Sequence, residues 1–255
     1  MATTQRREDA LSRQRIVDAA VALLDAAGAE GLTFRALATQ LKTGPGAIYW
    51  HVANKNELLI AATDAVLARA MSAGHPDHPG HPPEQAIRAV AVGVFDAIDA
   101  HPWAGTQLAL APAEPVMLRI FESLGQQVQA LGVPAAAQFT ATSALLNYIL
   151  GVAGQNAATA RAVDPATNRT EFLGRAASAW AGLDPAEYPF TRTVADQLRD
   201  HDDRAQFLDG VDLILTGIAA LGPNATGSGV PHQNAPPTGS VGGAVAGRAG
   251  VTELR

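Results

Sequence analysis

The sequence predicts an all-α protein with an N-terminal three-helix helix-turn-helix domain and a larger C-terminal helical domain. Three observations lead to this fold class. Apolar residues recur at the three- and four-residue spacing of amphipathic helices through most of the chain. A Gly- and Pro-rich stretch at residues 72–83 interrupts that pattern. Residues 33–58 have the pattern of two short helices joined by a tight turn and followed by a third helix.

The composition along the chain divides it into five segments. With 255 residues, the chain is long enough to bury a sizeable core in one or two domains. The last 34 residues hold eight of the 24 glycines, four prolines and no aromatic residue, so they cannot build a core. We expect a flexible arm at 1–11, the helix-turn-helix domain at 12–71, a linker at 72–83, a helical domain at 84–221 and a disordered tail at 222–255.

The helix-turn-helix pattern follows from local residue preferences. Thr33 is a suitable N-cap for a helix whose apolar residues fall on one face: Phe34, Leu37, Ala38 and Leu41. Residues 42–44 are poor helix formers and include a glycine, so the chain can turn there. Pro45 suits the first position of the next helix, because its missing N–H would have no partner there anyway. That helix, residues 45–51, is too short to be stable alone.

The outer face of this second helix is the candidate functional surface. Ile48 and Val52 would pack inward, which leaves the rest of the helix outside: Gly46, Ala47, Tyr49, Trp50 and His51. An exposed Tyr-Trp-His run is better explained by a binding partner than by a free surface. Asn54 and Glu57 form a capping-box-like start to the next helix, where Lys55 is placed to contact a phosphate. Two other readings stay open: Trp50 is part of the core, or His51 bonds a neighbouring helix.

Several motifs occur here in a fixed order: residues 15–28 (RIVDAAVALLDAAG), Glu30-Gly-Leu-Thr33, and Ile48-Tyr-Trp-His-Val52 followed by Asn54-Lys55. In these, residues 12–69 resemble the N-terminal domain of the tetracycline-repressor family of bacterial transcription factors. The resemblance implies a set of DNA-binding residues: Thr33, Arg35, Thr43, Pro45, Gly46, Ala47, Tyr49, Trp50, His51 and Lys55. Many members have Gly-Val-Ser before the recognition helix, where this chain has Lys42-Thr43-Gly44. The usual Ser cap is therefore missing, and Thr43 or Lys42 would take over part of the phosphate contact.

The charge of the chain is unevenly distributed. Residues 1–56 hold seven Lys or Arg and five acids, which is a net charge of +2. Because the whole chain has a net charge of −6, residues 57–255 carry a net charge of −8. Only the N-terminal part is electrostatically suited to DNA. Its first basic residues form either a basic arm beside the DNA backbone or a solvated terminus: Arg6, Arg7, Arg13 and Arg15. The chain has no long apolar run, no leader pattern and no cysteine, so we expect a cytoplasmic protein without membrane span or disulfide.

The C-terminal pattern predicts a second, larger helical domain. Helices are expected at residues 84–100, 114–131, 135–162, 170–181, 191–198 and 203–221, with 106–111 as a short connector. The helices at 135–162 and 203–221 are apolar over more than one stripe and contain glycines. In the family, the corresponding helices of two subunits form a four-helix interface. The resemblance therefore implies a homodimer on a palindromic operator, although a buried helix in a monomer would look similar.

We expect the C-terminal domain to contain a cavity for an apolar small molecule, with apolar walls and a few polar anchors. The candidate lining residues are Phe95, Trp103, Gln107, Met117, Phe121, Asn147, Tyr148, Gln155 and Trp180, and Asn156 is a further candidate anchor. Ordinary core packing explains each of them equally well. The metal-binding His of the tetracycline–magnesium repressor has no counterpart at residues 108–112, so a tetracycline–magnesium ligand is not supported. His75, His78 and His81 lie in the linker, each directly followed by Pro, and we expect no metal there. No other cofactor is expected.

No motif in the chain supports an enzyme. A phosphate-binding loop, a nucleophile elbow and HExxH spacing are all missing. We therefore expect a ligand-responsive transcriptional repressor that binds double-stranded DNA as a homodimer. The alternative is a helical small-molecule-binding protein with a degenerate DNA domain or, with less support, a helical enzyme.

Overall fold

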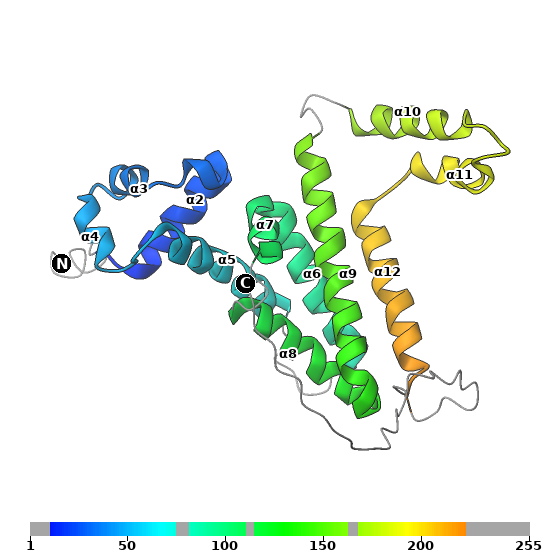
Figure 1. Ribbon diagram of the computed structural model, residues 1–255, viewed down its shortest axis with the longest axis horizontal. Helices are drawn as coiled ribbons and strands as arrows, with labels where there is room; N and C mark the ends of the chain where they lie inside the picture. Colours follow the sequence, from blue (N-terminus) through cyan, green and yellow to red (C-terminus); the bar gives the residue numbers. More distant parts are fainter. Residues whose placement is uncertain (1–10, 75–81, 111–114, 163–167, 223–255) are drawn as a thin grey trace, which may run out of the picture. The chain divides into compact units, whose positions relative to one another are not determined.

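The computed structural model describes residues 11–74, 82–110, 115–162 and 168–222, and these ranges contain helices and no strand. Figure 1 shows the helices in chain order. They are α2 (Arg13–Gly31), α3 (Phe34–Gln40), α4 (Pro45–Tyr49), α5 (Lys55–Gly74), α6 (Pro83–Ala100), α7 (Pro102–Leu110), α8 (Pro115–Ala130), α9 (Ala135–Ala162), α10 (Arg169–Ala181), α11 (Pro189–Val194), the 3-10 helix η1 (Ala195–Leu198) and α12 (Asp203–Ala219). The predicted fold class is confirmed for the described residues.

The N-terminal helices pack through α2. Ser12 caps α2 by accepting a hydrogen bond from the backbone N–H of Arg15. The apolar face of α2, which includes the fully buried Ile16, packs against α3 and α5. Near its end α2 is interrupted at Gly28, whose φ of +63° is a conformation that glycine adopts without strain.

In the larger helical body, α6 packs on α5, α8, α9 and α12. Gly93 of α6 crosses α5 so closely that an added Cβ would lie 2.9 Å from the carbonyl oxygen of Ala70. Two ion pairs join α6 to α12 in antiparallel register: Arg88 with Asp212 and Asp96 with Arg204. Because of the close contact at Gly93, a larger residue there would push α5 and α6 apart.

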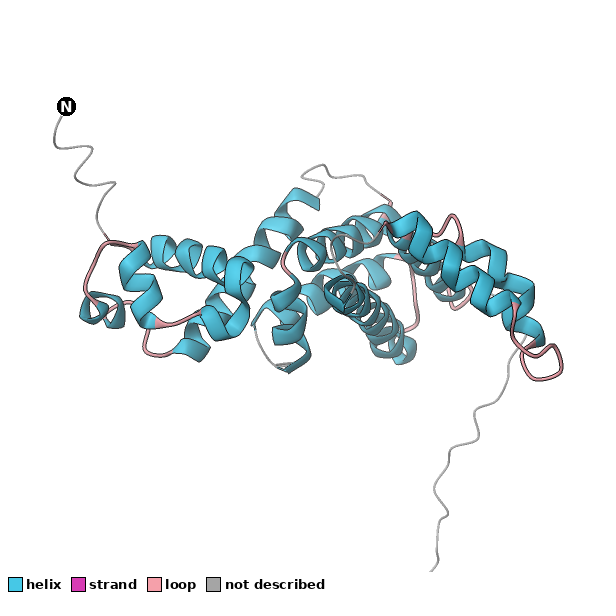
Figure 2. Cartoon of the chain, turned by 90° about the horizontal axis from the view of Figure 1, so that it is seen from above, coloured by secondary structure: helices cyan, strands magenta, loops and turns pink. Residues whose placement is uncertain are grey.

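One hydrophobic core runs through both the N-terminal helices and the body, from Ile16 on α2 to Ile218 on α12. The segment formed by α10, α11 and η1 lies outside this core, buries only Ala177 and Ala195, and packs mainly on itself. Figure 1 shows this segment beyond the upper ends of α9 and α12, and Figure 2, seen from above, shows only helices and loops among the described residues.

The helix boundaries agree closely with the sequence prediction, with one correction. Residues 106–111 were expected to be a connector, but most of them belong to α7, which begins at Pro102 directly after the break at His101. A proline at the start of a helix replaces an N–H that would have no partner, so Pro102 both ends α6 and begins α7. The expected arm, the centre of the linker and nearly all of the expected tail lie outside the described residues.

Candidate nucleic-acid interface and ligand cavity

The helix-turn-helix motif is formed by α3, a three-residue turn and α4. The Thr33 hydroxyl caps α3 by accepting the backbone N–H of Ala36, as predicted. The turn depends on Lys42, whose φ of +51° is the one positive value among the non-glycine residues described. Gly44 was expected to supply the flexible position, but its backbone is extended and it serves as the N-cap of α4. The strained residue of the turn is therefore a lysine.

Few interactions hold α4 in place, because it has five residues and no side-chain cap at Gly44. Ile48 and Val52 are buried, as predicted, and anchor its inner side. The ring of Tyr49 stacks on Phe34 of α3, with centroids 4.3 Å apart and planes 5° apart. The Tyr49 ring thus packs against the protein, while just over half of the side chain stays exposed.

The outer face of α4 presents the residues that the sequence singled out. Trp50 is 89 % exposed, so the reading of this side chain as part of the core is wrong. His51 is half-buried, and no side-chain hydrogen bond of its ring occurs among the described contacts. An added Cβ at Gly46 would meet no atom within 4 Å, so another molecule could approach the backbone there. Pro45 is exposed as well, and Thr43 and Ala47 are half-buried.

Three cations on the segments that adjoin α4 along the chain have no ion pair or side-chain hydrogen bond among the described residues: Arg35 of α3, Lys42 of the turn and Lys55 of α5. Lys55 is the first residue of α5, where the backbone N–H groups have no helical acceptor. Free cations beside an exposed helix start are suited to bind phosphate.

A polar network that the sequence did not predict connects α2 with the residues after α4. One guanidinium nitrogen of Arg13 donates to the carbonyl oxygen of His51 at 2.8 Å and to a Glu57 carboxylate oxygen at 2.7 Å. The other Glu57 oxygen accepts the backbone N–H of Ala53 at 2.8 Å, and the Asn54 side chain accepts the backbone N–H of Glu57. The bond from Ala53 and then the bond from Arg13 hold the pKa of Glu57 below its ordinary value. The predicted Asn54–Glu57 cap is thus present, and Arg13 joins it.

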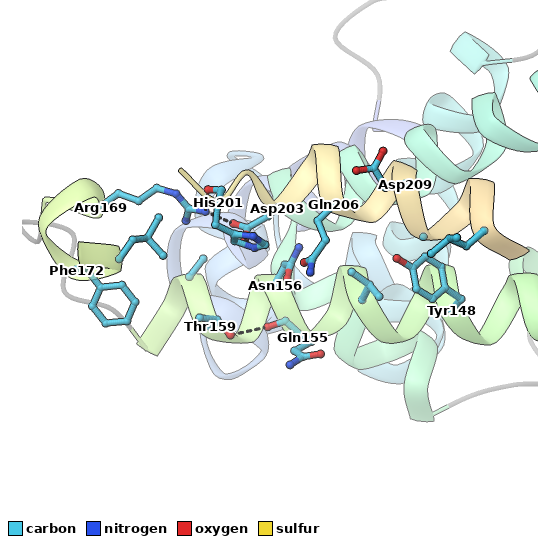
Figure 3. A pocket seen from close by; sticks show the side chains of 15 residues that line it. Tyr148, Gln155, Asn156, Thr159, Arg169, Phe172, His201, Asp203, Gln206 and Asp209 are labelled. Carbon is cyan, nitrogen blue, oxygen red and sulfur yellow. Dashed lines mark hydrogen bonds and ion pairs between the residues drawn. The ribbon is translucent and has the colours of Figure 1, made fainter. Parts of the chain in front are cut away.

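A cavity of about 790 Å³ lies between α9, α10 and α12. Figure 3 shows Asn156 of α9 pointing toward Gln206 of α12, with Tyr148 at one end of the cavity and Arg169 and Phe172 at the other. The lining combines hydrogen-bonding groups with apolar side chains such as Val152, Leu173 and Leu213.

The charges around the cavity are only partly paired. Arg169 and His201 both contact the Asp203 carboxylate, whereas Asp209 makes no described hydrogen bond or ion pair. Burial, and to a lesser extent the Asp209 carboxylate, raises the pKa of Tyr148, whose hydroxyl donates a hydrogen bond to the carbonyl oxygen of Phe207 at 3.3 Å. The cavity can thus offer both donors and acceptors.

Most of the predicted ligand residues do not line this cavity. Of the nine, Tyr148 and Gln155 do, together with the neighbouring Asn156. The others lie elsewhere. Phe95 stacks on Phe207 in the core, Trp103 donates its indole N–H to Asp25, and Phe121 packs on Phe139. Met117 is buried in the core, Gln107 is half-buried, and Asn147 and Trp180 are exposed.

Sequence reasoning missed the cavity residues on α10 and α12. Arg169, Phe172 and Asp203 lie on segments that come together only in the fold, and no local pattern marks them. No cluster of three or more metal-ligating side chains occurs among the described residues, which do not include His75, His78 and His81. In the described ranges, we also find no helix with the length and apolar character that a membrane span requires.

Comparison with known proteins identifies the family. Residues 16–62 match the family of bacterial regulatory proteins, tetR family, and residues 79–221 match the tetracyclin repressor-like C-terminal domain. An HTH-type transcriptional regulator of Saccharopolyspora erythraea is 32% identical over 147 residues, which are 57% of this chain and 61% of that protein. The class D tetracycline repressor of Escherichia coli is 46% identical over 59 residues, 23% of this chain and 27% of that protein. The chain thus spans less than two thirds of these curated relatives.

The solved structures cover more of the chain. The transcriptional regulator SCO7222, a TetR from Streptomyces coelicolor, is 59% identical, with a TM-score of 0.76 over 83% of this chain and 99% of that one. ActR of Streptomyces coelicolor in complex with (S)-DNPA is 22% identical, with a TM-score of 0.64 over 83% of this chain and 98% of that one, and shares the fold. The chain therefore belongs to the tetR family of bacterial regulatory proteins.

Proposed function

We propose that this chain is a cytoplasmic transcriptional repressor that binds a palindromic DNA duplex as a homodimer and releases it when a small molecule binds. The observation that carries the proposal is the exposed Trp50 directly after α4, on a helix-turn-helix whose cations Arg35, Lys42 and Lys55 have no partner among the described residues. Trp50 is the most exposed of the large hydrophobic side chains described. The major groove of DNA is wide enough to admit a helix such as α4.

The contacts of each side chain suggest a division of roles. Trp50 and His51 lie at the end of α4 and would meet base edges, whereas the three cations would contact phosphates. The ring of Tyr49 packs against Phe34, so its hydroxyl is the part left for a phosphate oxygen. Gly46 and Ala47 are small and would let the α4 backbone approach the groove. Thr33, Thr43 and Pro45 lie at the starts of α3 and α4 and would follow the DNA backbone.

The homodimer is supported by the outer faces of α9 and α12. An added Cβ at Gly151, Gly154 or Gly217 would meet no atom within 4 Å, so these glycines border open space. Leu213 of α12 is 75 % exposed. Glycine costs about 1 kcal/mol in a helix interior, which a close helix contact with a second subunit would offset. Two subunits related by a twofold axis would present two α4 helices to a palindrome.

The effector site is best placed in the cavity between α9, α10 and α12. Its lining is mostly apolar with several hydrogen-bonding groups, which favours a ligand that has hydrogen-bonding groups on an apolar framework. ActR, whose fold is shared, has been solved in complex with (S)-DNPA and with actinorhodin. The signal would reach the DNA-binding helices through two polar contacts: Arg119 of α8 with Asp64 of α5, and Trp103 of α7 with Asp25 of α2. A ligand acts only by binding one arrangement of these helices more tightly.

Selection of the full chain on random duplex DNA tests the proposal. We expect enrichment of an inverted repeat and a dimer in sedimentation at micromolar concentration. Lys55→Ala should weaken binding to all sequences and lower its salt dependence by about one counterion. A monomer, or selection without an enriched sequence, would favour a helical small-molecule-binding protein with a degenerate DNA domain. Membership in a family of regulatory proteins supports this function over an enzymatic one.

A further inference from the structure

The short helix α4 cannot by itself fix the orientation of Trp50 and His51, which follow it directly. A five-residue helix without a side-chain cap has little stability of its own. Burial of Ile48 fixes the inner side of α4, the Tyr49–Phe34 stack fixes its last residue, and the buried Val52 anchors the segment that follows. None of these apolar contacts binds the carbonyl oxygen of His51 or the N–H of Ala53, the polar backbone groups on either side of Val52.

The network of Arg13 and Glu57 binds both of these groups. Arg13 reaches from the first turn of α2 and binds the carbonyl oxygen of His51, which is the residue beside Trp50. The same nitrogen donates to Glu57 on the first turn of α5, and Glu57 in turn accepts the N–H of Ala53. The two side chains therefore bind the segment between α4 and α5 on both sides and connect it to α2.

We propose that Arg13 and Glu57 are positioning residues for DNA recognition, which fix the direction of the Trp50–His51 edge and do not themselves contact DNA. This inference rests on the proposed function, in which α4 reads the DNA sequence. It gives Arg13 a different role from the two that the sequence left open, a basic arm beside the DNA backbone and a solvated terminus. The guanidinium already has a carboxylate and a carbonyl oxygen as acceptors.

The charge of Glu57 makes the proposal testable, because electrostatics and positioning predict opposite signs. Glu57 lies two residues from Lys55, beside the proposed phosphate contact. A carboxylate there repels phosphate, so electrostatics alone predicts that Glu57→Gln strengthens DNA binding. If Glu57 acts by holding Arg13 and Ala53, the same substitution weakens binding despite the lost negative charge.

The experiment measures affinity and salt dependence on two DNA probes. The first is a duplex enriched from random DNA by the wild-type chain, and the second is a random duplex of equal length. We expect Glu57→Gln to weaken binding to the enriched duplex about ten-fold, since it removes a charge-assisted hydrogen bond that solvent partly screens. The effect on the random duplex should be smaller, and the slope of log affinity against log salt should stay unchanged.

A matched control distinguishes the loss of the Glu57 hydrogen bonds from the loss of a negative charge elsewhere in the N-terminal helices. Glu30 lies in the last turn of α2, is exposed and makes no described side-chain contact. Glu30→Gln also removes one negative charge from the N-terminal helices, but it leaves the hydrogen bonds of Arg13 and Glu57 intact. We expect it to bind both duplexes as tightly as the wild type or slightly more tightly.

Variants of Arg13 distinguish positioning from phosphate contact. Arg13→Ala should weaken binding to the enriched duplex about ten-fold with the same salt slope, and Arg13→Lys should restore part of the loss. The double variant Arg13→Ala/Glu57→Gln should be little weaker than either single variant, because both remove one network. Hydrogen exchange without DNA should show faster exchange of the Ala53 amide in each of these variants except Arg13→Lys.

Three results would overturn the inference. The first is that Glu57→Gln binds the enriched duplex as tightly as the wild type or more tightly. The second is that Arg13→Ala lowers the salt dependence of binding by about one counterion. The third is that the Ala53 amide exchanges at the wild-type rate in the Glu57→Gln and Arg13→Ala variants. If the wild-type chain enriches no DNA, the proposed function fails on its own. The exchange measurement then still decides whether Arg13 and Glu57 hold the segment after α4.

Discussion

Replacing Trp50 by alanine should separate folding from DNA recognition. In the free protein this side chain is 89 % exposed, so about a tenth of its surface is buried. An aromatic side chain buries about 150–250 Å² when fully enclosed, and each square ångström contributes about 25 cal/mol. Truncation should therefore lower the free energy of unfolding by about 0.5 kcal/mol, which corresponds to about 1–2 °C in melting temperature for a chain of this size.

The loss in DNA affinity should be much larger than the loss in stability. Aromatic residues at the centre of an interface typically contribute at least about 2 kcal/mol on truncation, or about 30-fold in affinity. We expect a loss of this size for Trp50→Ala on the duplex enriched by selection, and a much smaller loss on a random duplex. Fluorescence anisotropy with labelled duplexes measures both, and a thermal melt measures stability.

A control and two contrary results complete the test. Leu118 of α8 is 61 % exposed, so Leu118→Ala should change neither the melting temperature nor the DNA affinity appreciably. A drop of more than about 5 °C for Trp50→Ala would show that the side chain supports the core. Equal losses on both duplexes would show that it contacts the DNA backbone and does not read the sequence.

Three further predictions concern the turn, the α9–α12 contact and acid stability. Lys42→Gly should be about 1 kcal/mol more stable than Lys42→Ala in chemical denaturation, because the φ of +51° strains any residue with a Cβ. Both variants should lose similar DNA affinity. Equal stabilities of the two variants would contradict the turn geometry. An added Cβ at Gly210 would overlap the Tyr148 phenol, so Gly210→Ala should destabilise the fold by about 1–3 kcal/mol. Gly174 is the control, because an added Cβ there would have its nearest contact 3.8 Å away. Gly174→Ala should stabilise the fold by up to about 1 kcal/mol. The pKa of Glu57 is lowered on folding, so its contribution is fully present above its ordinary value of 4.5 and is lost as the pH falls through the lower folded value. The melting temperature of Glu57→Gln should therefore lie below that of the wild type at pH 7 and approach it below pH 4.5; a constant difference would exclude this ionisation as the cause.

The sequence predicted the helices well because their ends depend on nearby residues. Thr33 and Asn54 cap helices through hydrogen bonds to residues three positions away, and Pro102 and Pro115 mark helix starts. The exposed edge of α4 was also predictable, since helical spacing separates Ile48 from its outward-facing neighbours. Such features depend on only a few consecutive residues, so a single sequence contains the required information.

The features that sequence reasoning missed depend on residues far apart in the chain. Arg13 meets His51 and Glu57 across 38 and 44 positions, and nothing near Arg13 marks it as a partner of the recognition helix. Seven of the nine expected ligand residues lie outside the cavity between α9, α10 and α12 for a related reason. A buried aromatic such as Phe95 has the same local pattern whether it lines a cavity or, as here, stacks on another core ring. Only the packing of separate helices decides between the two.

The acidic net charge of the chain is compatible with DNA binding because its charges are unevenly paired. Four of the five acids in residues 11–74 already have a partner: Asp18 with Arg69, Asp25 with His101 and Trp103, Glu57 with Arg13, and Asp64 with Arg119. By contrast, Arg35, Lys42 and Lys55 have none among the described residues. At physiological ionic strength, charges more than about 8 Å from a phosphate are largely screened. The unpaired cations beside α4 therefore determine the local attraction to DNA, and the net charge of −6 is no argument against it.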